Sequence, residues 1–195
     1  MKFLFLGNQL ALDFLNTQPV QGGEAQELLP DFGSLIDWFE AAGVLTKADS
    51  AAMRRRWAGS DRATAAYADA LRLREKWRKE VLAWEGGAAV HGATLDELNR
   101  LMAEHPVRIR VRAEGKTVSK ELWFRIQEPE DLLGPLAHSA ASLFAEADRE
   151  RVRKCGNCVL HFLDTSKKGT RRWCSMEFCG NRLKVAAYAA RHRTK

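Results

Sequence analysis

The four cysteines of the chain form two closely spaced pairs in its last quarter. Two residues separate Cys155 from Cys158, and a second pair follows fifteen residues later. Four residues separate Cys174 from Cys179. Structural zinc sites hold the ion with four tetrahedral thiolates, and two pairs joined by a hairpin-sized segment supply them. In the Gly156-Asn157 dipeptide we expect a positive φ that turns backbone N–H groups toward the sulfurs. The spacing predicts one structural Zn²⁺ held by all four cysteines.

Other cysteine chemistries fit the sequence less well. Two disulfides need an oxidising compartment, but the apolar start of the chain is broken between Gly7 and Asp13 and no cleavage site follows. A Cys-x-x-Cys redox site would leave the second pair unused, whereas an iron–sulfur cluster stays open as an alternative. Catalytic zinc needs a free coordination position, which four cysteines close. We expect the nearby His161 and His192 to be solvated or loosely packed rather than ligands, and the protein to be cytoplasmic.

Basic side chains concentrate in the same segment as the cysteines. Residues 149–195 carry thirteen Lys and Arg against three acids, a net charge of +10, whereas residues 1–148 carry eighteen against twenty-two, a net charge of −4. Because a zinc ion with four thiolates carries −2, a surplus of +8 remains on the segment. Such a density is the electrostatic footprint of a phosphate-binding surface. The sequence therefore favours a nucleic acid as the partner of this segment.

The expected contacts to nucleic acid are basic residues beside the second cysteine pair and on the last helix. They are Arg171, Arg172, Arg182, Lys184, Arg191 and Arg193. A helix that is basic around much of its circumference resembles one that inserts into a groove. Two structural alternatives remain: the arginines can neutralise the zinc centre, and Arg182 can donate to backbone carbonyls of the knuckles. We expect Trp173 to pack over the zinc centre. In the competing interpretation, the protein is an adaptor whose zinc module only stabilises a protein-docking surface.

Helices are expected to dominate the chain before the zinc segment. Apolar periodicity and helix-capping residues predict helices at roughly 8–17, 28–43, 46–57, 60–84 and 94–105. The apolar stripe of the long helix consists of Ala70, Leu73, Trp77, Val81 and Trp84. Thr46 and Asp49 have the spacing of a capping box. No apolar run is long enough for a transmembrane helix.

The apolar period changes to two between residues 107 and 126. Apolar residues alternate with Arg108, Arg110 and Arg112, and Glu114-Gly115-Lys116 makes a turn before the alternation resumes. This pattern predicts a hairpin with one buried face and an arginine row on its open face. Water, an acidic partner or an anionic ligand could face that row. Pro129 then suits the first turn of a helix that reaches about residue 147.

The zinc segment is expected to contain a hairpin of its own between the two cysteine pairs. Residues 159–173 have a strand-like start, a turn at 166–169 and a return through Trp173. Residues 183–190 then form a strong helix. A knuckle, a hairpin and a helix that supplies the second cysteine pair constitute a treble clef. The predicted fold class is α+β: a mainly helical domain with a β-hairpin at 1–148, then a treble-clef zinc module at 149–195.

The N-terminal region shows no catalytic arrangement. It contains no phosphate-binding glycine loop, no Gly-x-Ser-x-Gly and no His-Glu-x-x-His, so we do not expect an enzyme. Asp13 and Asn16 lie one helical turn apart, where they serve either a hydrogen-bond network within the fold or a bound ligand. We expect this domain to sense a small molecule or a protein effector.

Several segments together resemble the CGNR zinc-finger family. The motif at the end of the chain consists of residues 155–158 (CGNC), 162–166 (FLDTS), 171–176 (RRWCSM) and 179–182 (CGNR). Residues 11–17 (ALDFLNT) are similar to the motif that opens the ABATE domain of the same family. The resemblance implies a bacterial protein with an α+β N-terminal domain and a treble-clef finger, in a family described as stress-linked transcription regulators. It also implies double-stranded DNA as the nucleic acid. A single finger reads few base pairs, so a homodimer is a further expectation.

Overall fold

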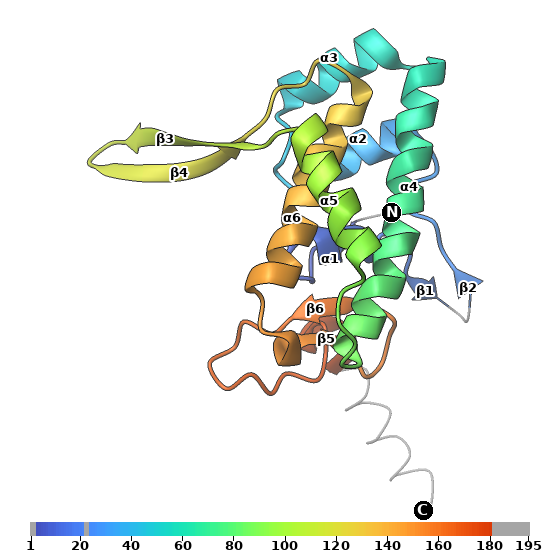
Figure 1. Ribbon diagram of the computed structural model, residues 1–195, viewed down its shortest axis with the longest axis vertical. Coiled ribbons are helices and arrows are strands. Elements are labelled where there is room, and N and C mark those ends of the chain that lie inside the picture. The colour runs from blue at the N-terminus through green and yellow to red at the C-terminus, as the bar shows by residue number, and fades with distance from the viewer. Residues whose placement is uncertain (1–2, 22–23, 181–195) are drawn as a thin grey trace, which may run out of the picture.

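The computed structural model describes residues 3–21 and 24–180 of the chain. Helices make up most of the first part, and short strands form three separate two-stranded sheets (Figure 1). The helices are α1 (Leu10–Leu15), α2 (Phe32–Ala41), α3 (Lys47–Trp57), α4 (Asp61–Glu85), α5 (Gly92–Glu104) and α6 (Leu133–Glu146), with short 3₁₀ turns η1 (Pro129–Leu132) and η2 (Arg149–Arg151) and the π-helical turn η3 (Met176–Gly180). The strands are β1 (Val20–Gln21), β2 (Glu24–Ala25), β3 (Arg108–Glu114), β4 (Thr117–Trp123), β5 (Val152–Lys154) and β6 (His161–Leu163). The predicted α+β class is confirmed.

Side-chain caps determine where several helices begin. The predicted capping box is present at α3, where the Thr46 hydroxyl accepts from the Asp49 N–H and the Asp49 carboxylate accepts from the Thr46 N–H. Asp31 and Ser34 form a second capping box at α2, so that helix begins at Phe32, later than predicted. Ser60 caps α4 by accepting from the Ala63 N–H. These bonds satisfy N–H groups that have no partner inside the helix.

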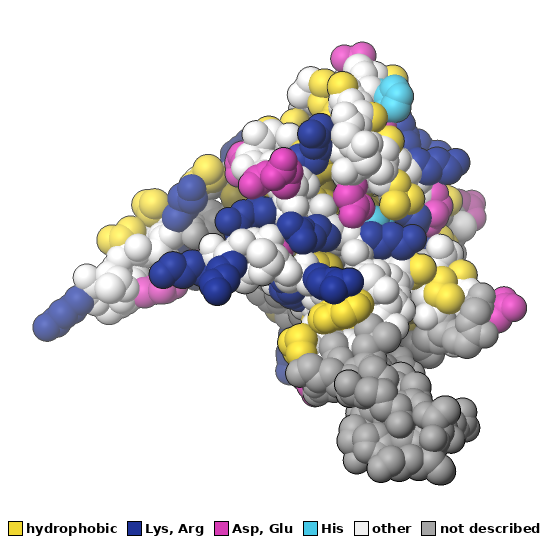
Figure 2. All heavy atoms as spheres, turned by 90° about the horizontal axis from the view of Figure 1, so that it is seen from below, with side chains coloured by type: hydrophobic (Ala, Val, Ile, Leu, Met, Phe, Trp, Pro, Cys, Tyr) yellow, Lys and Arg dark blue, Asp and Glu magenta, His cyan; other side chains and the backbone are white. Residues whose placement is uncertain are grey.

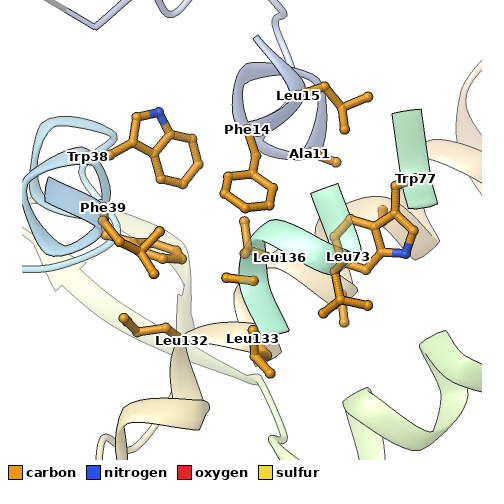
Figure 3. Packing of buried hydrophobic residues seen from close by; sticks show 14 of the residues in the cluster. Ala11, Phe14, Leu15, Trp38, Phe39, Leu73, Trp77, Leu132, Leu133 and Leu136 are labelled. Carbon is orange, nitrogen blue, oxygen red and sulfur yellow. The ribbon is translucent and has the colours of Figure 1, made fainter. Parts of the chain in front are cut away.

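The main core lies between α1, α2, α4 and α6. Short α1 runs through its centre, and all of its residues from Ala11 to Leu15 are buried. Phe14 meets Trp38 of α2 with ring centroids 5.4 Å apart, and Leu136 approaches from α6 (Figure 3). The predicted apolar stripe of α4 is buried along its whole length and covers the other side of α1. A six-residue helix is too short to be stable alone, so this burial is what holds it.

The hairpin of β3 and β4 is present, but its predicted buried face is wrong. The hairpin projects away from the helices as a free arm (Figure 1), and every residue of β3 is exposed. Its strands pair in register from Arg108 opposite Trp123 to Glu114 opposite Thr117. The strands and the turn that the alternation of side chains predicted are confirmed. The alternation could not show whether another element packs on the apolar face, and none of the described residues does so over most of its length.

The hairpin of the zinc module differs from the predicted one. β5 pairs with β6, so the strands flank the first cysteine pair instead of lying between the two pairs. Residues 164–173 form no ladder, because their backbone groups are bound elsewhere. The Asp164 carboxylate accepts from the N–H groups of Ser166 and Arg171, and the Arg172 carbonyl accepts from the Gly156 N–H. The helix predicted at 183–190 lies outside the described residues.

The zinc module contacts the lower end of the helical region in Figure 1. β6 contacts α1, η2 contacts α4, and Leu4 and Leu6 pack into the small core of the zinc module. The predicted domain boundary at 148/149 falls between α6 and η2 and stays a prediction. Within the described ranges, no helix combines the length and apolarity that a bilayer span requires.

Candidate metal centre

The four cysteine sulfurs converge on one point. Cys174 Sγ lies 3.7 Å from Cys158 Sγ and 3.6 Å from Cys179 Sγ, and all four sulfurs lie within 4.8 Å of one another. A tetrahedral zinc–thiolate site with Zn–S distances of about 2.3 Å has edges of about 3.8 Å. The separations match these edges. Thiolates of an iron–sulfur cluster bind separate irons and would stand further apart. The geometry therefore fits a single tetrahedral ion, and four thiolates select zinc in a closed, structural site.

The four thiols lie so close together that the ionisation of one affects the pKa of the others. The hydrogen bond from Cys174 lowers the pKa of Cys158 to about 5, and the same contact raises the pKa of Cys174 above its ordinary value. Burial raises the pKa of Cys179 to about 11. Without a cation, the cluster holds one thiolate and resists ionisation of its neighbours. A divalent ion removes this repulsion and lets all four thiols ionise together.

Gly156 shapes the first knuckle by leaving space for Trp173. The expected positive φ is not found at Gly156 or Asn157. Instead, a Cβ at Gly156 would lie 2.9 Å from Cζ3 of Trp173, closer than real Cβ contacts. The Gly156 N–H donates to the Arg172 carbonyl, and the Cys155 N–H donates to the Leu160 carbonyl across the knuckle. The expected packing of Trp173 beside the zinc centre is confirmed, because its ring joins the apolar cluster that contains the cysteines.

Buried Asp164 and two arginines hold the backbone of the loop between Asp164 and Arg172. Asp164 is fully buried; burial opposes ionisation, but hydrogen bonds from Ser166 and Arg171 outweigh it and lower the pKa of Asp164 to about 2. Arg151 donates to the carbonyls of Asp164 and Ser166, and Arg153 donates to the carbonyl of Gly169. The guanidinium groups of Arg151 and Arg153 are therefore both bonded within the zinc module. The loop is held by these hydrogen bonds, and residues 165–168 are exposed to solvent.

The structure separates the predicted contact residues of this loop. The Arg171 guanidinium donates to the carbonyls of Trp173 and Cys174 and stacks on Phe162, so it supports the second cysteine pair. Arg172 is exposed, with its guanidinium 5.4 Å from the centre of the Trp173 ring. Lys167 and Lys168 beside it are also exposed and make no ion pair within residues 3–21 and 24–180. The sequence predicted these lysines only as part of a turn, although two consecutive lysines before Gly169 are themselves a pattern typical of an exposed basic loop.

The other predicted contact residues lie beyond the described part of the chain. Arg182, Lys184, Arg191 and Arg193 belong to residues 181–195, as does His192. Lys and Arg side chains on the described surface are gathered on the face in Figure 2, which views the molecule from the zinc-module end. Within the described part of the zinc module, Lys167, Lys168 and Arg172 are exposed and present part of its positive charge to solvent.

Asn16 and His161 join the zinc module to the helical region. Asn16 Nδ2 donates to the His161 carbonyl and Asn16 Oδ1 accepts from the His161 N–H, both at 2.8 Å. His161 is 2% exposed, so of the two expected environments, solvated or loosely packed, the solvated one is wrong: the ring faces Glu85 at the end of α4. Its Nδ1 lies 3.5 Å from Glu85 Oε2, and Glu85 also accepts from the Lys154 N–H. Burial opposes ionisation of Glu85, but the bonds from His161 and Lys154 lower its pKa.

Asp13 also serves the fold. Its Oδ1 accepts from the Gly7 N–H at 2.7 Å, which turns the N-terminal segment so that the Gly7 carbonyl accepts from Leu163 of β6. Burial raises the pKa of Asp13 to about 6, although bonds from Gly7 and Leu6 oppose the rise. Asp13 and Asn16 thus belong to a network around β6, and neither lines the clefts described next. Their role as ligand contacts stays a prediction without support from these contacts.

Two clefts open where the β3–β4 arm leaves the helices. One measures about 600 Å³ and lies between the base of β4, α6 and the end of α2, with Leu10, Val44 and Phe124 in its wall. The other measures about 510 Å³ and lies on the α3 side of the same strand. Leu122 lines both. The first is large enough for a small ligand.

Four cysteines on a closed knuckle, next to a basic loop, define a zinc-finger protein with a structural metal. Two family models match the chain: residues 151–192 match the CGNR zinc finger, and residues 8–147 match ABATE, described as "Putative stress-induced transcription regulator". The chain belongs to this ABATE and CGNR zinc-finger family. No curated protein matches it. The resemblance stated from the motifs is confirmed, and the family description agrees with a regulatory rather than an enzymatic protein.

Proposed function

We propose that this protein regulates transcription by binding double-stranded DNA through the surface of its zinc module. The observation that supports this most is the loop at 164–172. Asp164, Arg151 and Arg153 fix its backbone, while Lys167, Lys168 and Arg172 stay exposed without carboxylate partners among the described residues. Cations that are not paired internally remain free to displace counterions from phosphates.

The family supplies the regulatory role, and the charge distribution supplies the partner. Residues 149–195 keep a surplus of positive charge after the zinc–thiolate centre is counted. In the described part of the module, the buried acid Asp164 does not offset this charge, because its carboxylate accepts from the backbone N–H groups of Ser166 and Arg171. DNA carries the dense negative charge that such a surface attracts at long range.

The test measures binding of the zinc-loaded full chain to random-sequence duplex DNA over a range of salt concentrations. We expect log K to fall linearly with log[salt], with a slope of about −0.9 for each phosphate contact. The triple variant K167A/K168A/R172A should keep its zinc and bind more weakly, with a slope shallower by up to about 2.7.

The matched control removes three cations from α3, at the opposite end of the molecule in Figure 1: K47A/R55A/R56A. This control has the same net charge as the triple variant, so it separates contact from a general field effect. The DNA proposal is abandoned if the wild-type chain does not bind duplex DNA even at low salt. That outcome favours the adaptor interpretation, in which the zinc module only stabilises a protein-docking surface.

A further inference from the structure

The β3–β4 arm exposes a mostly apolar face, on which Lys120, opposite Val111, is the one charged residue. Residues directly opposite each other in the ladder share a face, so Ile109 pairs with Leu122 on one side, and Val111 and Val118 continue that side toward the tip. Their exposed fractions are 59%, 54%, 70% and 74%, respectively. In Figure 2 most of the apolar side chains of the arm lie along one side, with a basic side chain among them, and further basic side chains lie along the other. Exposed apolar patches of this kind mark interaction sites.

The opposite face of the arm is already satisfied by its own residues. Arg110 and Arg112 both pair with Glu121, and the guanidinium groups of Arg108 and Arg110 lie 5.9 Å from the centre of the Trp123 ring. Arg110 and Arg112 share one carboxylate, so their charge is partly offset and they have less to gain from phosphates than unpaired cations have. The face that lacks a partner is therefore the apolar one, and a partner for it must itself be apolar.

The isolated arm also needs support for its own stability. A two-stranded hairpin alone in water is marginally stable, and a third strand or a packed face is required to hold it. With seven residues in each strand, the arm extends about 23 Å from its base. Only the base receives support from the body, through Phe124, Ile126 and the residues around them. The apolar face gains this support when it is covered.

The charges of the arm complement those of the body from which it projects. Residues 107–126 carry six Lys and Arg against two Glu, a net charge of +4, and the remainder of residues 1–148 carries −8. The 600 Å³ cleft at the base of the arm continues its apolar face and contains the carboxylate of Glu146, with no Lys or Arg in its wall; its other acid, Glu121, is already paired with Arg110 and Arg112. Lys116 and Lys120 near the tip make no ion pair within the described chain. A basic arm tip thus fits an acidic cleft of the kind found on this same protein.

We propose that the partner of the arm is a second copy of this chain. In a two-fold dimer, the apolar faces of two arms lie against each other, and each tip reaches toward the acidic cleft of the other copy. Such an interface is isologous, since the same surface from each copy forms both halves. The arrangement covers the apolar residues of both arms and brings two zinc modules, one from each chain, into one dimer. The proposal does not depend on DNA binding, because the dimer is expected without nucleic acid.

The variant that tests this interface is V111E/V118K, which leaves the net charge unchanged. Val111 stands opposite Lys120, so the new carboxylate gains a cross-strand partner and the hairpin is retained. The control is T117K/S119E, which places the same pair of charges on the other face of the same arm. Sedimentation equilibrium of the zinc-loaded chain measures the dimer dissociation constant of each. We expect V111E/V118K to raise it at least about 100-fold and T117K/S119E to leave it within a few-fold of wild type.

Amide hydrogen exchange at high and low protein concentration then locates the interface. We expect protection of β3 and β4 to rise with concentration in the wild-type chain and in T117K/S119E only. A wild-type monomer throughout the concentration range would overturn the proposal. So would a dimer that V111E/V118K does not weaken. A monomer whose affinity for duplex DNA falls in T117K/S119E would instead assign the arm to nucleic acid.

Discussion

Asn16 and His161 are paired as two strands of an antiparallel sheet are paired, with the Asn16 side-chain amide taking the place of a backbone. The amide donates to the His161 carbonyl and accepts from the His161 N–H, each at 2.8 Å, across 145 positions of sequence. Asn16, the C-cap residue of α1, thus satisfies both buried backbone groups of a residue in β6. The zinc module and the helical region are therefore joined through the motif that opens the ABATE domain.

Asn16→Ala should destabilise the chain and loosen its zinc module. Removing the amide leaves the N–H and the carbonyl of His161 buried without partners, at a cost of about 2–4 kcal/mol. Urea unfolding gives the free energy of unfolding, and the rate of zinc transfer to a chromogenic chelator shows whether the module opens more often. We expect a lower unfolding free energy and a faster transfer.

Asn99→Ala is the matched control for this change, because Asn99 is exposed on α5 and far from the zinc module in sequence. It should match wild type in both measurements. If Asn16→Ala released zinc no faster than Asn99→Ala, the bonds between Asn16 and His161 would not be what keeps the zinc module closed.

Cys174→Ser should abolish zinc binding while most of the helix content remains. Cys174 is fully buried, and its sulfur is within 3.7 Å of two other ligands, so three cysteines cannot close the shell. Metal binding and folding are coupled in such modules, and the order of β5, β6 and the 164–172 loop should be lost. The main core consists almost entirely of residues before the module. Metal analysis and far-UV circular dichroism test both statements; retention of one equivalent of zinc would contradict the ligand assignment.

The sequence allowed prediction of the features that depend on local spacing. The cysteine pairs, the Thr46 and Asp49 capping box and the α4 stripe are each encoded within a few residues of one another, and all are present. The chemistry of each is also local: thiolates select a metal, and hydroxyl and carboxylate groups cap helices.

Features that depend on contacts between distant segments could not be predicted. The pairing of Asn16 with His161 and the pairing of β5 with β6 are tertiary arrangements, and no local pattern distinguishes them from alternatives. The apolar face of the β3–β4 arm shows the same limitation. Its alternation predicts that a face will be covered, but within this chain no described element covers it.

Gly156→Ala should weaken the zinc knuckle by displacing Trp173. The added methyl would lie 2.9 Å from the indole, and the glycine has no positive φ, so crowding alone causes the effect. A displaced side chain of this size costs about 1–3 kcal/mol. We expect lower stability of the zinc-loaded chain and altered near-UV circular dichroism.

Gly92→Ala is the control for the glycine change. A Cβ at Gly92 meets nothing within 4 Å, and the residue is the first of α5. The substitution should be neutral or slightly stabilising. Equal effects of the two substitutions on stability would mean that contact with Trp173 is not the cause of the loss at Gly156.

Asp13 should give the folded chain a stability that decreases as the pH rises from about 4 to about 6. Burial raises the pKa of the folded Asp13 from its ordinary value of 3.8 to about 6, so in this range the unfolded chain loses a proton that the folded chain keeps. The unfolded state is favoured by this release, and the lost stability approaches about 3 kcal/mol above pH 6. Asp13→Asn has no proton to lose between pH 4 and pH 6.

The difference in unfolding free energy between Asp13→Asn and wild type should therefore rise from pH 4 to pH 6 and then stay level. Urea unfolding at intervals of half a pH unit measures it, and the zinc site contributes equally to both proteins. A difference that does not change with pH would mean that the carboxyl group keeps its ordinary pKa and that the bond to Gly7 is made by a carboxylate throughout.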